Sequence, residues 1–252
     1  MTQNLKKKLI LFIILITCIS PAAGESLTIV TIKVAPFGFN DANGKPTGMM
    51  FDISNRIAEE AGFDYTNTLL PYARTIMKLQ RGQADFVLRF SNEQLSVIAE
   101  PLSSIISMPI ILLSQAGNAL KTLEHLHGKT VGVIRGGAFD NNFDNDTAII
   151  KYDTNDYSQI IKMLIRGRLD AGIGTNVGLY FSASKLGIKP EVFNPPLHLS
   201  AKDFILHFSK RNKNTKTKDA LKNSVEKLKA SGEIKNIVNS YMGKFKWETP
   251  TN

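Results

Sequence analysis

A helix–turn–strand unit that occurs twice limits the possible folds of this chain more than any other feature. The first copy is Leu69–Ser91. Pro71 suits the first turn of a helix, where no N–H is needed, and Gly82 suits its end, because glycine adopts the left-handed conformation readily. Ile76 and Leu79 lie between them on one helical face. The apolar residues after Gly82 then predict a short buried strand.

The second copy repeats six positions of the first at one constant offset along the chain. Two such copies predict two similar lobes, and we interpret the repeated positions as scaffold. Arg74 and Arg89 are not repeated, because Gln159 and Gly174 stand at the equivalent positions. A scaffold role would persist in both lobes, so these two arginines are candidates for holding a ligand. The matched pairs are Tyr72 and Tyr157, Ile76 and Ile161, Leu79 and Leu164, Arg81 and Arg166, Gly82 and Gly167, and Asp85 and Asp170.

The first 24 residues have the composition of a secretory signal peptide. Lys6–Lys8 precede an apolar run, Leu9–Ile19, and Ala22 and Gly24 are small residues suited to cleavage before Glu25. A membrane anchor is the alternative, but the run is shorter than the ~20 residues that a spanning helix needs. We therefore predict an exported, periplasmic protein whose mature part begins at Glu25.

Cys18 is the single cysteine of the chain. It could carry a lipid, but Thr17 before it is bulkier than lipid-attachment sites normally accept, so we predict no lipid anchor. Removal of the signal peptide then leaves no cysteine for a disulfide. The mature part must be stabilised by its apolar core and its topology.

The chain is basic, with a formal net charge of +9, and three of its lysines lie in the predicted signal peptide. The remaining charge favours an anionic ligand or a membrane surface, or it reflects a solvated lysine-rich face. The sequence contains neither a zinc finger nor an aromatic RNA-binding strand, so we expect no nucleic-acid partner.

Strands and helices alternate along the mature part, which predicts an α/β fold with mostly parallel sheets. The chain is expected to cross between two lobes twice, near Ile105–Ser114 and near Asp203–Ser209. Lobe 1 would comprise residues 25–110 and 205–252, and lobe 2 residues 111–204. Helices are predicted to begin at or just after Asp52, Pro71, Gly136-Gly137, Asp156, Thr175, Thr217 and Glu233.

Three candidate residues lie just past predicted strands, namely Phe37, Arg89 and Arg135. Open α/β sheets bind ligands beyond the carboxyl ends of their strands. All three side chains are therefore expected to face a cleft between the lobes.

Four segments of the mature part follow one another in an order known from one protein family. They are APFGFNDANGKPTGMMFDI, LLPYARTIMKLQRGQADFVL, HGKTVGVIRGGAFD and DFILHFSKRNKNTKTKDALKNSVEKLKASGEIKNIVNSYMG. Together they resemble the periplasmic solute-binding proteins of the polar amino acid type, extracellular solute-binding protein family 3. The resemblance implies a two-lobed periplasmic-binding-protein fold, in which α/β lobes joined by two crossover strands close on a ligand like a flytrap. It also implies a small-molecule ligand, with the inner-membrane permease of an ABC importer as partner.

The resemblance transfers ligand-binding roles only where residues match. Phe37 and Phe39 hold the places of aromatic side chains that often cover the ligand in this family. Gln94 stands where amino-acid binders place an arginine, and Thr175 stands where they place an aspartate for the amino group. Both charged clamps for an α-amino acid are therefore absent from their usual places. The candidate ligand-binding residues are Phe37, Phe39, Tyr72, Arg74, Arg89, Gln94, Arg135 and Thr175.

Arg74 could replace the missing arginine. It lies in the first turn of its predicted helix, where unpaired N–H groups and the helix dipole favour anions. A guanidinium there can bind a carboxylate through two parallel hydrogen bonds, although a surface ion pair is the alternative. Among acidic residues, only Asp140 is a candidate partner for an ammonium group. We therefore expect common α-amino acids to bind poorly and a small anionic or neutral polar solute to bind better.

Catalytic and metal-binding interpretations have weaker support. Ser182 and Lys185 match S-x-x-K, but the companion motifs S-D-N and K-T-G are absent. His125 and His127 form an H-x-H without a third residue spaced to complete a zinc site. We therefore expect a monomeric binding protein, without enzymatic activity, cofactor or metal, that delivers its solute to an ABC importer. A ligand-sensing protein that signals to a membrane receptor, and a dehydratase-like enzyme on the same fold, are the alternatives.

Overall fold

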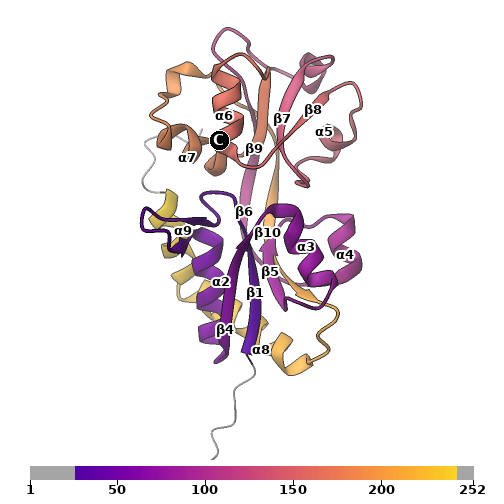
Figure 1. The fold of residues 1–252 in the computed structure, drawn as a ribbon, viewed down its shortest axis with the longest axis vertical. Coiled ribbons are helices and arrows are strands. Elements are labelled where there is room, and N and C mark those ends of the chain that lie inside the picture. The colour runs from indigo at the N-terminus through magenta and orange to yellow at the C-terminus, as the bar shows by residue number, and fades with distance from the viewer. Residues whose placement is uncertain (1–25, 243–252) are drawn as a thin grey trace, which may run out of the picture.

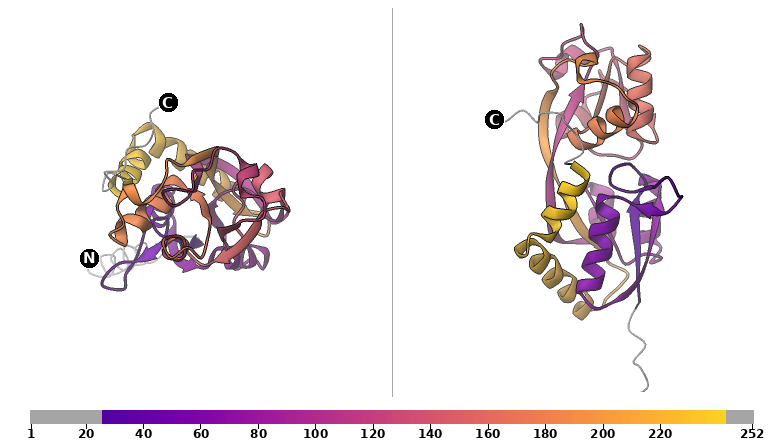
Figure 2. Two further views of the ribbon diagram at one scale, coloured as in Figure 1. Left: turned by 90° about the horizontal axis from the view of Figure 1, so that it is seen from above. Right: turned by 90° about the vertical axis from the view of Figure 1, so that its left-hand side faces the viewer.

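Two long antiparallel strands, β6 (Ala99–Leu113) and β10 (Leu197–Ser209), run side by side through both halves of the molecule (Figure 1; Figure 2). The structure is a computed structural model that describes residues 26–242, so the predicted signal peptide lies outside the described residues. The two strands cross between the lobes in the expected regions, but each begins earlier than the predicted Ile105 and Asp203. The added residues mix polar and apolar types and are mostly half-buried, so their strand structure depends on pairing with the other strand rather than on an apolar pattern.

The hydrogen-bonded sheet is continuous through these two strands, in the order β4-β1-β5-β10-β6-β9-β7-β8. Parallel strands β4, β1 and β5 form lobe 1, and parallel strands β9, β7 and β8 form lobe 2. This arrangement confirms the predicted two-lobed α/β fold. The lobe boundaries at residues 110 and 204 fall inside β6 and β10 and remain a prediction, because both strands belong to both lobes. The bounds are β1 (Ser26–Ile32), β4 (Asp64–Leu70), β5 (Phe86–Arg89), β7 (Thr130–Ile134), β8 (Ile150–Thr154) and β9 (Ala171–Thr175).

Helices cover both faces of the sheet in lobe 1 (Figure 1). Helices α2, α8 and α9 pack together on one face, and α3 and α4 lie on the other. Both ends of the described chain belong to lobe 1. The bounds are α2 (Met49–Glu60), α3 (Tyr72–Gln80), α4 (Glu93–Ile98), α8 (Thr215–Ala230) and α9 (Glu233–Met242), with a small hairpin of β2 (Phe39–Asn40) and β3 (Pro46–Thr47).

Lobe 2 repeats the helix–turn–strand unit of lobe 1, as predicted. Its copy consists of α6 (Tyr157–Ile165) and β9, which correspond to α3 and β5. The apolar face of α6, with Ile160, Ile161 and Leu164, is fully buried against the sheet. The remaining bounds are α5 (Asn141–Asn145), α7 (Asn176–Lys185) and the 3₁₀ turns η1 (Leu123–Leu126) and η2 (Pro190–Val192).

The predicted start of α2 at Asp52 is wrong. Gly48 is the N-cap, with a φ of 133°, and the helix begins at Met49. Only glycine fits there, because a Cβ would lie 2.7 Å from the carbonyl oxygen of Phe37. The Asp52 carboxylate lies inside the first turn and accepts a hydrogen bond from the hydroxyl of Tyr241 in α9 at 2.5 Å.

The predicted helix start at Gly136-Gly137 is also wrong. Gly136 has a left-handed φ of 75° and belongs to the turn that ends β7. Helix α5 begins only at Asn141, where the carboxylate of Asp140 accepts hydrogen bonds from two backbone N–H groups. Asp140, the candidate partner for an ammonium group, is therefore occupied as a helix cap.

Gly178 in α7 leaves room for the ring of Tyr157. A Cβ at position 178 would lie 2.2 Å from a ring carbon of Tyr157. Gly178→Ala is therefore expected to lower the free energy of unfolding by about 1–3 kcal/mol, because the buried ring must move. Urea unfolding measures this change. Ser184→Ala, at an exposed position of the same helix, is the control, and an equal midpoint for the two variants would contradict the expectation.

Candidate functional site

A cavity of about 490 Å³, here called the cleft cavity, lies between the two lobes. Its walls follow the carboxyl ends of β1 and β4 in lobe 1, and of β7 and β8 in lobe 2. Open parallel sheets bind ligands at this edge. The lining residues are Lys33, Pro71, Tyr72, Ala73 and Arg74 from lobe 1, and Ile134, Arg135, Thr154, Asn155 and Asp156 from lobe 2.

Three exposed cationic side chains line the cleft cavity, namely those of Lys33, Arg74 and Arg135. Lys33 and Arg74 take part in no ion pair within residues 26–242, whereas Arg135 Nε lies 3.4 Å from an oxygen of Asp153. Asp156 is the acidic lining residue, and its carboxylate already accepts a hydrogen bond from a backbone N–H of α6 at 2.8 Å. The cleft cavity therefore carries an excess of positive charge.

Two helix N-termini also meet at the cleft cavity. Pro71 and Asp156, the N-cap residues of α3 and α6, are both lining residues. The first-turn N–H groups of a helix have no intrahelical partner, and the helix dipole favours negative charge there. Asp156 caps α6, but no side chain caps α3. The N-terminus of α3 is therefore open to an anion from the cavity.

Arg89 lies beneath the cleft cavity rather than in its wall. The side chain is fully buried, and its guanidinium carbon is 4.1 Å from the centre of the Tyr72 ring. One terminal nitrogen donates hydrogen bonds to the Tyr72 carbonyl at 3.2 Å and to the Thr75 hydroxyl at 2.7 Å. Nε and the other terminal nitrogen have no hydrogen-bond partner among the described residues. Arg89 thus supports Tyr72 and places a buried positive charge under the cavity.

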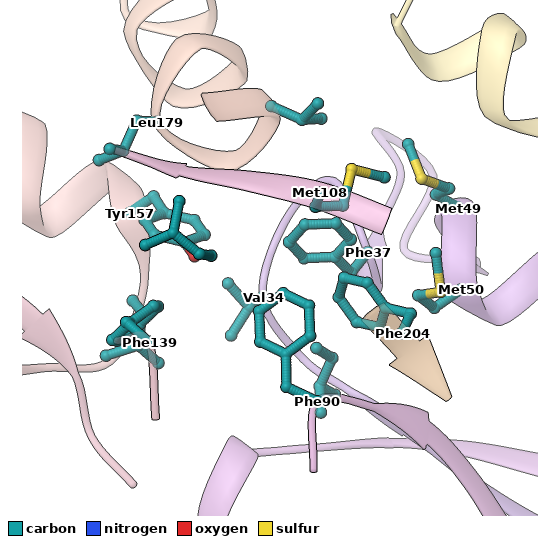
Figure 3. Close-up of a cluster of buried hydrophobic side chains, with 14 of the residues drawn as sticks. Val34, Phe37, Met49, Met50, Phe90, Met108, Phe139, Tyr157, Leu179 and Phe204 are labelled. Carbon is teal, nitrogen blue, oxygen red and sulfur yellow. The ribbon is translucent and has the colours of Figure 1, made fainter. Parts of the chain in front are cut away.

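A second, apolar pocket adjoins the cleft cavity and shares Tyr72 and Ile134 with it. In Figure 3, Phe139 and Tyr157 of lobe 2 face Val34, Phe37, Phe90 and Phe204 across it. The Phe204 ring packs on the rings of Phe37 and Phe90, with centroid distances of 4.8 and 4.4 Å. The full lining of this aromatic pocket is Ile32, Val34, Phe37, Tyr72, Phe90, Ile134, Phe139, Tyr157 and Phe204.

Thr175 is fully buried and its polar groups are already paired. Its hydroxyl accepts a hydrogen bond from the Gly178 N–H at 3.0 Å, which confirms the predicted N-cap of α7. Its own N–H donates to the Tyr157 hydroxyl at 3.2 Å. Burial raises the pKa of Tyr157 to about 12, so this hydroxyl stays neutral. Lobe 2 therefore presents a neutral aromatic ring near the place where the family would place an aspartate.

The other sequence-based candidates are spread over different parts of the cleft. Tyr72, Arg74 and Arg135 line the cleft cavity, and Phe37 lines the aromatic pocket. Phe39 lies outside both spaces, and its ring instead contacts Phe181 of lobe 2 at 5.7 Å between centroids. Gln94 is exposed in the first turn of α4 and lines neither space.

Sequence reasoning missed several lining residues, of which Tyr157 is the most informative. It was interpreted as scaffold because it repeats Tyr72. Since Tyr72 follows a strand at the cleft edge of lobe 1, the same repeat could have placed Tyr157 at the cleft edge of lobe 2. Lys33 carried a similar signal, because it directly follows the first strand.

Two α/β lobes that are joined by two crossover strands and have a cavity between them have the architecture of periplasmic binding proteins. The chain belongs to the bacterial extracellular solute-binding proteins, family 3, because residues 27–244 match that family. A curated relative, the probable amino-acid-binding protein YxeM of Bacillus subtilis (strain 168), is 21% identical over 216 residues. That match covers 82% of this chain and 79% of the relative.

Solved structures with the same fold include a binding protein and a sensor domain. A mutant of ArgBP from T. maritima matches with a TM-score of 0.75 and 20% identity, covering 86% of this chain and 95% of its own. A histidine kinase sensor domain with similarity to periplasmic binding proteins matches with a TM-score of 0.75 and 15% identity, covering 88% and 97%. At identities of 20% and 15%, the similarity to these two structures shows a shared fold and nothing more.

Within residues 26–242, no group of three or more His, Cys, Asp or Glu side chains is arranged to hold a metal ion. No helix in this part of the chain has the length and apolar character needed to span a membrane.

Proposed function

We propose that this protein binds a small organic anion in the periplasm and delivers it to the inner-membrane permease of an ABC importer. The observation that carries the proposal is the cleft cavity, which combines three cationic side chains with the open N-terminus of α3. Its walls come from both lobes, so a bound anion would hold the lobes together. The closed, ligand-bound form is the one that a membrane partner can recognise.

An organic anion suits the site better than a zwitterionic amino acid. The similar proteins bind amino acids according to their names, and these ligands also carry an ammonium group. Of the carboxylates near the cleft, Asp156 and Asp140 already cap helices and Asp153 is paired with Arg135, while Thr175 is buried and paired. A charge that is buried without its partner typically costs about 2–5 kcal/mol in binding free energy. An α-amino acid would therefore bind more weakly than the matching acid without the ammonium group.

A sensory role is the second candidate, because a histidine kinase sensor domain shares the fold. In that case the same closure would signal to a membrane receptor. The comparisons give no support to the dehydratase-like alternative, since the similar proteins named above are binding proteins or a sensor. We therefore propose a non-enzymatic role.

Arg74→Ala is expected to weaken anion binding at least tenfold while leaving the melting temperature of the unliganded protein nearly unchanged. The side chain is exposed and has no ion-pair partner within residues 26–242, so its loss removes a ligand contact but no ion pair of that part. A thermal-shift screen of organic acids first identifies a ligand, since ligand at one hundred times its Kd stabilises by about 2.7 kcal/mol. Titration calorimetry then compares the variants.

Arg81→Ala is the matched control, because Arg81 is an exposed arginine at the opposite end of α3. It is expected to bind the anion as the unmodified protein does. An undiminished affinity in Arg74→Ala would remove Arg74 from the site. Tighter binding of glutamine or arginine than of any organic acid would contradict the proposed ligand class.

A further inference from the structure

The cleft cavity and the aromatic pocket adjoin each other and form two chemically different ends of the cleft. Tyr72 and Ile134 belong to both linings. One end carries Lys33, Arg74 and Arg135, whereas the nine side chains of the other end include no charged group. A ligand that fills both ends must therefore be charged at one end and apolar at the other.

The walls of the aromatic pocket come from both lobes. Lobe 1 contributes Val34, Phe37 and Phe90, and lobe 2 contributes Phe139 and Tyr157 (Figure 3). An apolar group between these rings would be removed from water on both faces, which is the arrangement that gains most from the hydrophobic effect.

The lobes are in contact in this structure, which leaves the aromatic pocket almost full. A Cβ on Gly136 would lie 3.5 Å from the Cβ of Ala73 in the other lobe, and Phe39 touches Phe181. The pocket has room of about 10 Å³, roughly what one water molecule needs. Because its walls belong to different lobes, hinge opening separates them and admits a larger group.

The side chains of the aromatic pocket offer a polar ligand group only two hydroxyls, those of Tyr72 and Tyr157. The hydroxyl of Tyr157 is already bonded to the Thr175 N–H, and the remaining lining side chains, apart from Tyr72, are hydrocarbon. An ammonium or hydroxyl group placed there would lose its hydrogen bonds to water without full replacement. The pocket thus selects against polar substituents next to the apolar group.

We propose that the ligand is a carboxylate that carries a ring-sized apolar group and no ammonium group. Its carboxylate would lie among the cations of the cleft cavity and its apolar group between the rings of the aromatic pocket. This inference rests on the proposed function, because it places the anion in the same cleft. It adds the apolar group of the ligand, which the cationic side chains of the cleft cavity do not specify.

Three compounds test the inference by titration calorimetry with the unmodified protein. Propanoate has only the anionic end, 3-phenylpropanoate adds the apolar ring, and phenylalanine adds an ammonium group to that. We expect 3-phenylpropanoate to bind at least tenfold more tightly than either of the others. Equal or tighter binding of propanoate would show that the aromatic pocket is unused, and equal or tighter binding of phenylalanine would show that the ammonium is accepted. Either result overturns the inference.

The outcomes also separate the inference from the proposed function. Binding of a purely polar dicarboxylate such as succinate, with no heat from 3-phenylpropanoate, would overturn the inference and leave anion binding intact. Failure of every organic acid, including these, would overturn both.

Phe139→Leu tests the position of the ring. Phe139 lines the aromatic pocket, whereas Phe143 is buried in the same lobe outside it, so Phe143→Leu is the matched control. We expect Phe139→Leu to weaken binding of 3-phenylpropanoate at least fivefold without changing the affinity for propanoate. Phe143→Leu is expected to leave the ratio of the two affinities unchanged. The reverse pattern would overturn the inference. If Phe139→Leu does not fold, Val34→Thr, which keeps the side-chain shape, repeats the test from lobe 1.

Discussion

Arg89→Met is expected to weaken anion binding about thirtyfold and to leave the unliganded protein at least as stable as before. Arg89 is fully buried, has no carboxylate partner among the described residues, and keeps two nitrogens without hydrogen bonds. Burial of an unpaired charge is costly, so an apolar side chain of similar length relieves that cost. Thr75 is not left unpaired, because its hydroxyl still donates to the Tyr72 carbonyl at 2.8 Å.

The loss of affinity follows from the position of the charge. The guanidinium carbon lies 4.1 Å from the centre of the Tyr72 ring, and Tyr72 lines the cavity. A ligand charge on the opposite side of the ring would be roughly 8 Å away, and at an effective dielectric constant of about 20 the attraction is about 2 kcal/mol. That free energy corresponds to the thirtyfold change.

Calorimetric titration and urea unfolding of Arg89→Met measure the two effects. Lys78→Met removes an equal charge from the last turn of α3, away from the cavity, and is expected to change neither quantity much. Unchanged anion affinity together with a large loss of stability in Arg89→Met would mean that Arg89 has only a structural role.

The folded protein is expected to lose stability as the pH is lowered from about 6.5 to about 4, and His207 is expected to account for about 3 kcal/mol of the loss. Burial, and then the positive charge of Arg89, lower the pKa of His207 from 6.5 to about 4. Between these values the unfolded chain binds a proton that the folded protein excludes. The stabilisation by neutral His207 is therefore complete above the pKa of this side chain in the unfolded chain. It is lost as the pH falls through the pKa of His207 in the folded protein.

Urea unfolding at pH 7 and pH 4.5 tests this expectation. His207→Gln is expected to lose about 2 kcal/mol less than the unmodified protein between the two pH values, by the same linkage. His198→Gln, an exposed position in the same strand, is the control and should behave like the unmodified protein. Asp52 and Asp144, whose pKa values are raised by burial, act in the opposite direction in all variants and cancel in the comparison. Equal pH dependence of the two glutamine variants would contradict the role of His207.

Local signals in the sequence were sufficient for most of the fold. Helix faces, glycine stops and the repeated unit predicted two α/β lobes, because each of these signals acts within one or two turns of the chain. The start of α2 was missed because Gly48 is selected by contact with Phe37, which no local pattern shows. The full length of β6 and β10 was missed because their first residues, which mix polar and apolar types, are held by pairing between distant segments.

Local signals in the sequence predicted only part of the candidate site. Arg74 and Arg135 were placed in the cleft from their positions at a helix start and at a strand end, and both line the cavity. Tyr157 was interpreted as scaffold, yet it lines the aromatic pocket. Whether an interior residue faces its own core or the other lobe depends on how the lobes meet, which the sequence pattern does not contain.

By itself, the sequence determined the two-lobed α/β architecture, the family resemblance and the positive character of the cleft, because these depend on residue type and order. Only the tertiary structure decided which polar groups remain free for a ligand. Thr175, Asp156 and Asp140 are occupied by helix caps, whereas Arg89 is buried beneath Tyr72 with unused donors. A hydrogen-bonding group can serve a ligand only if no nearer protein group already uses it, and that condition is set by contacts in three dimensions.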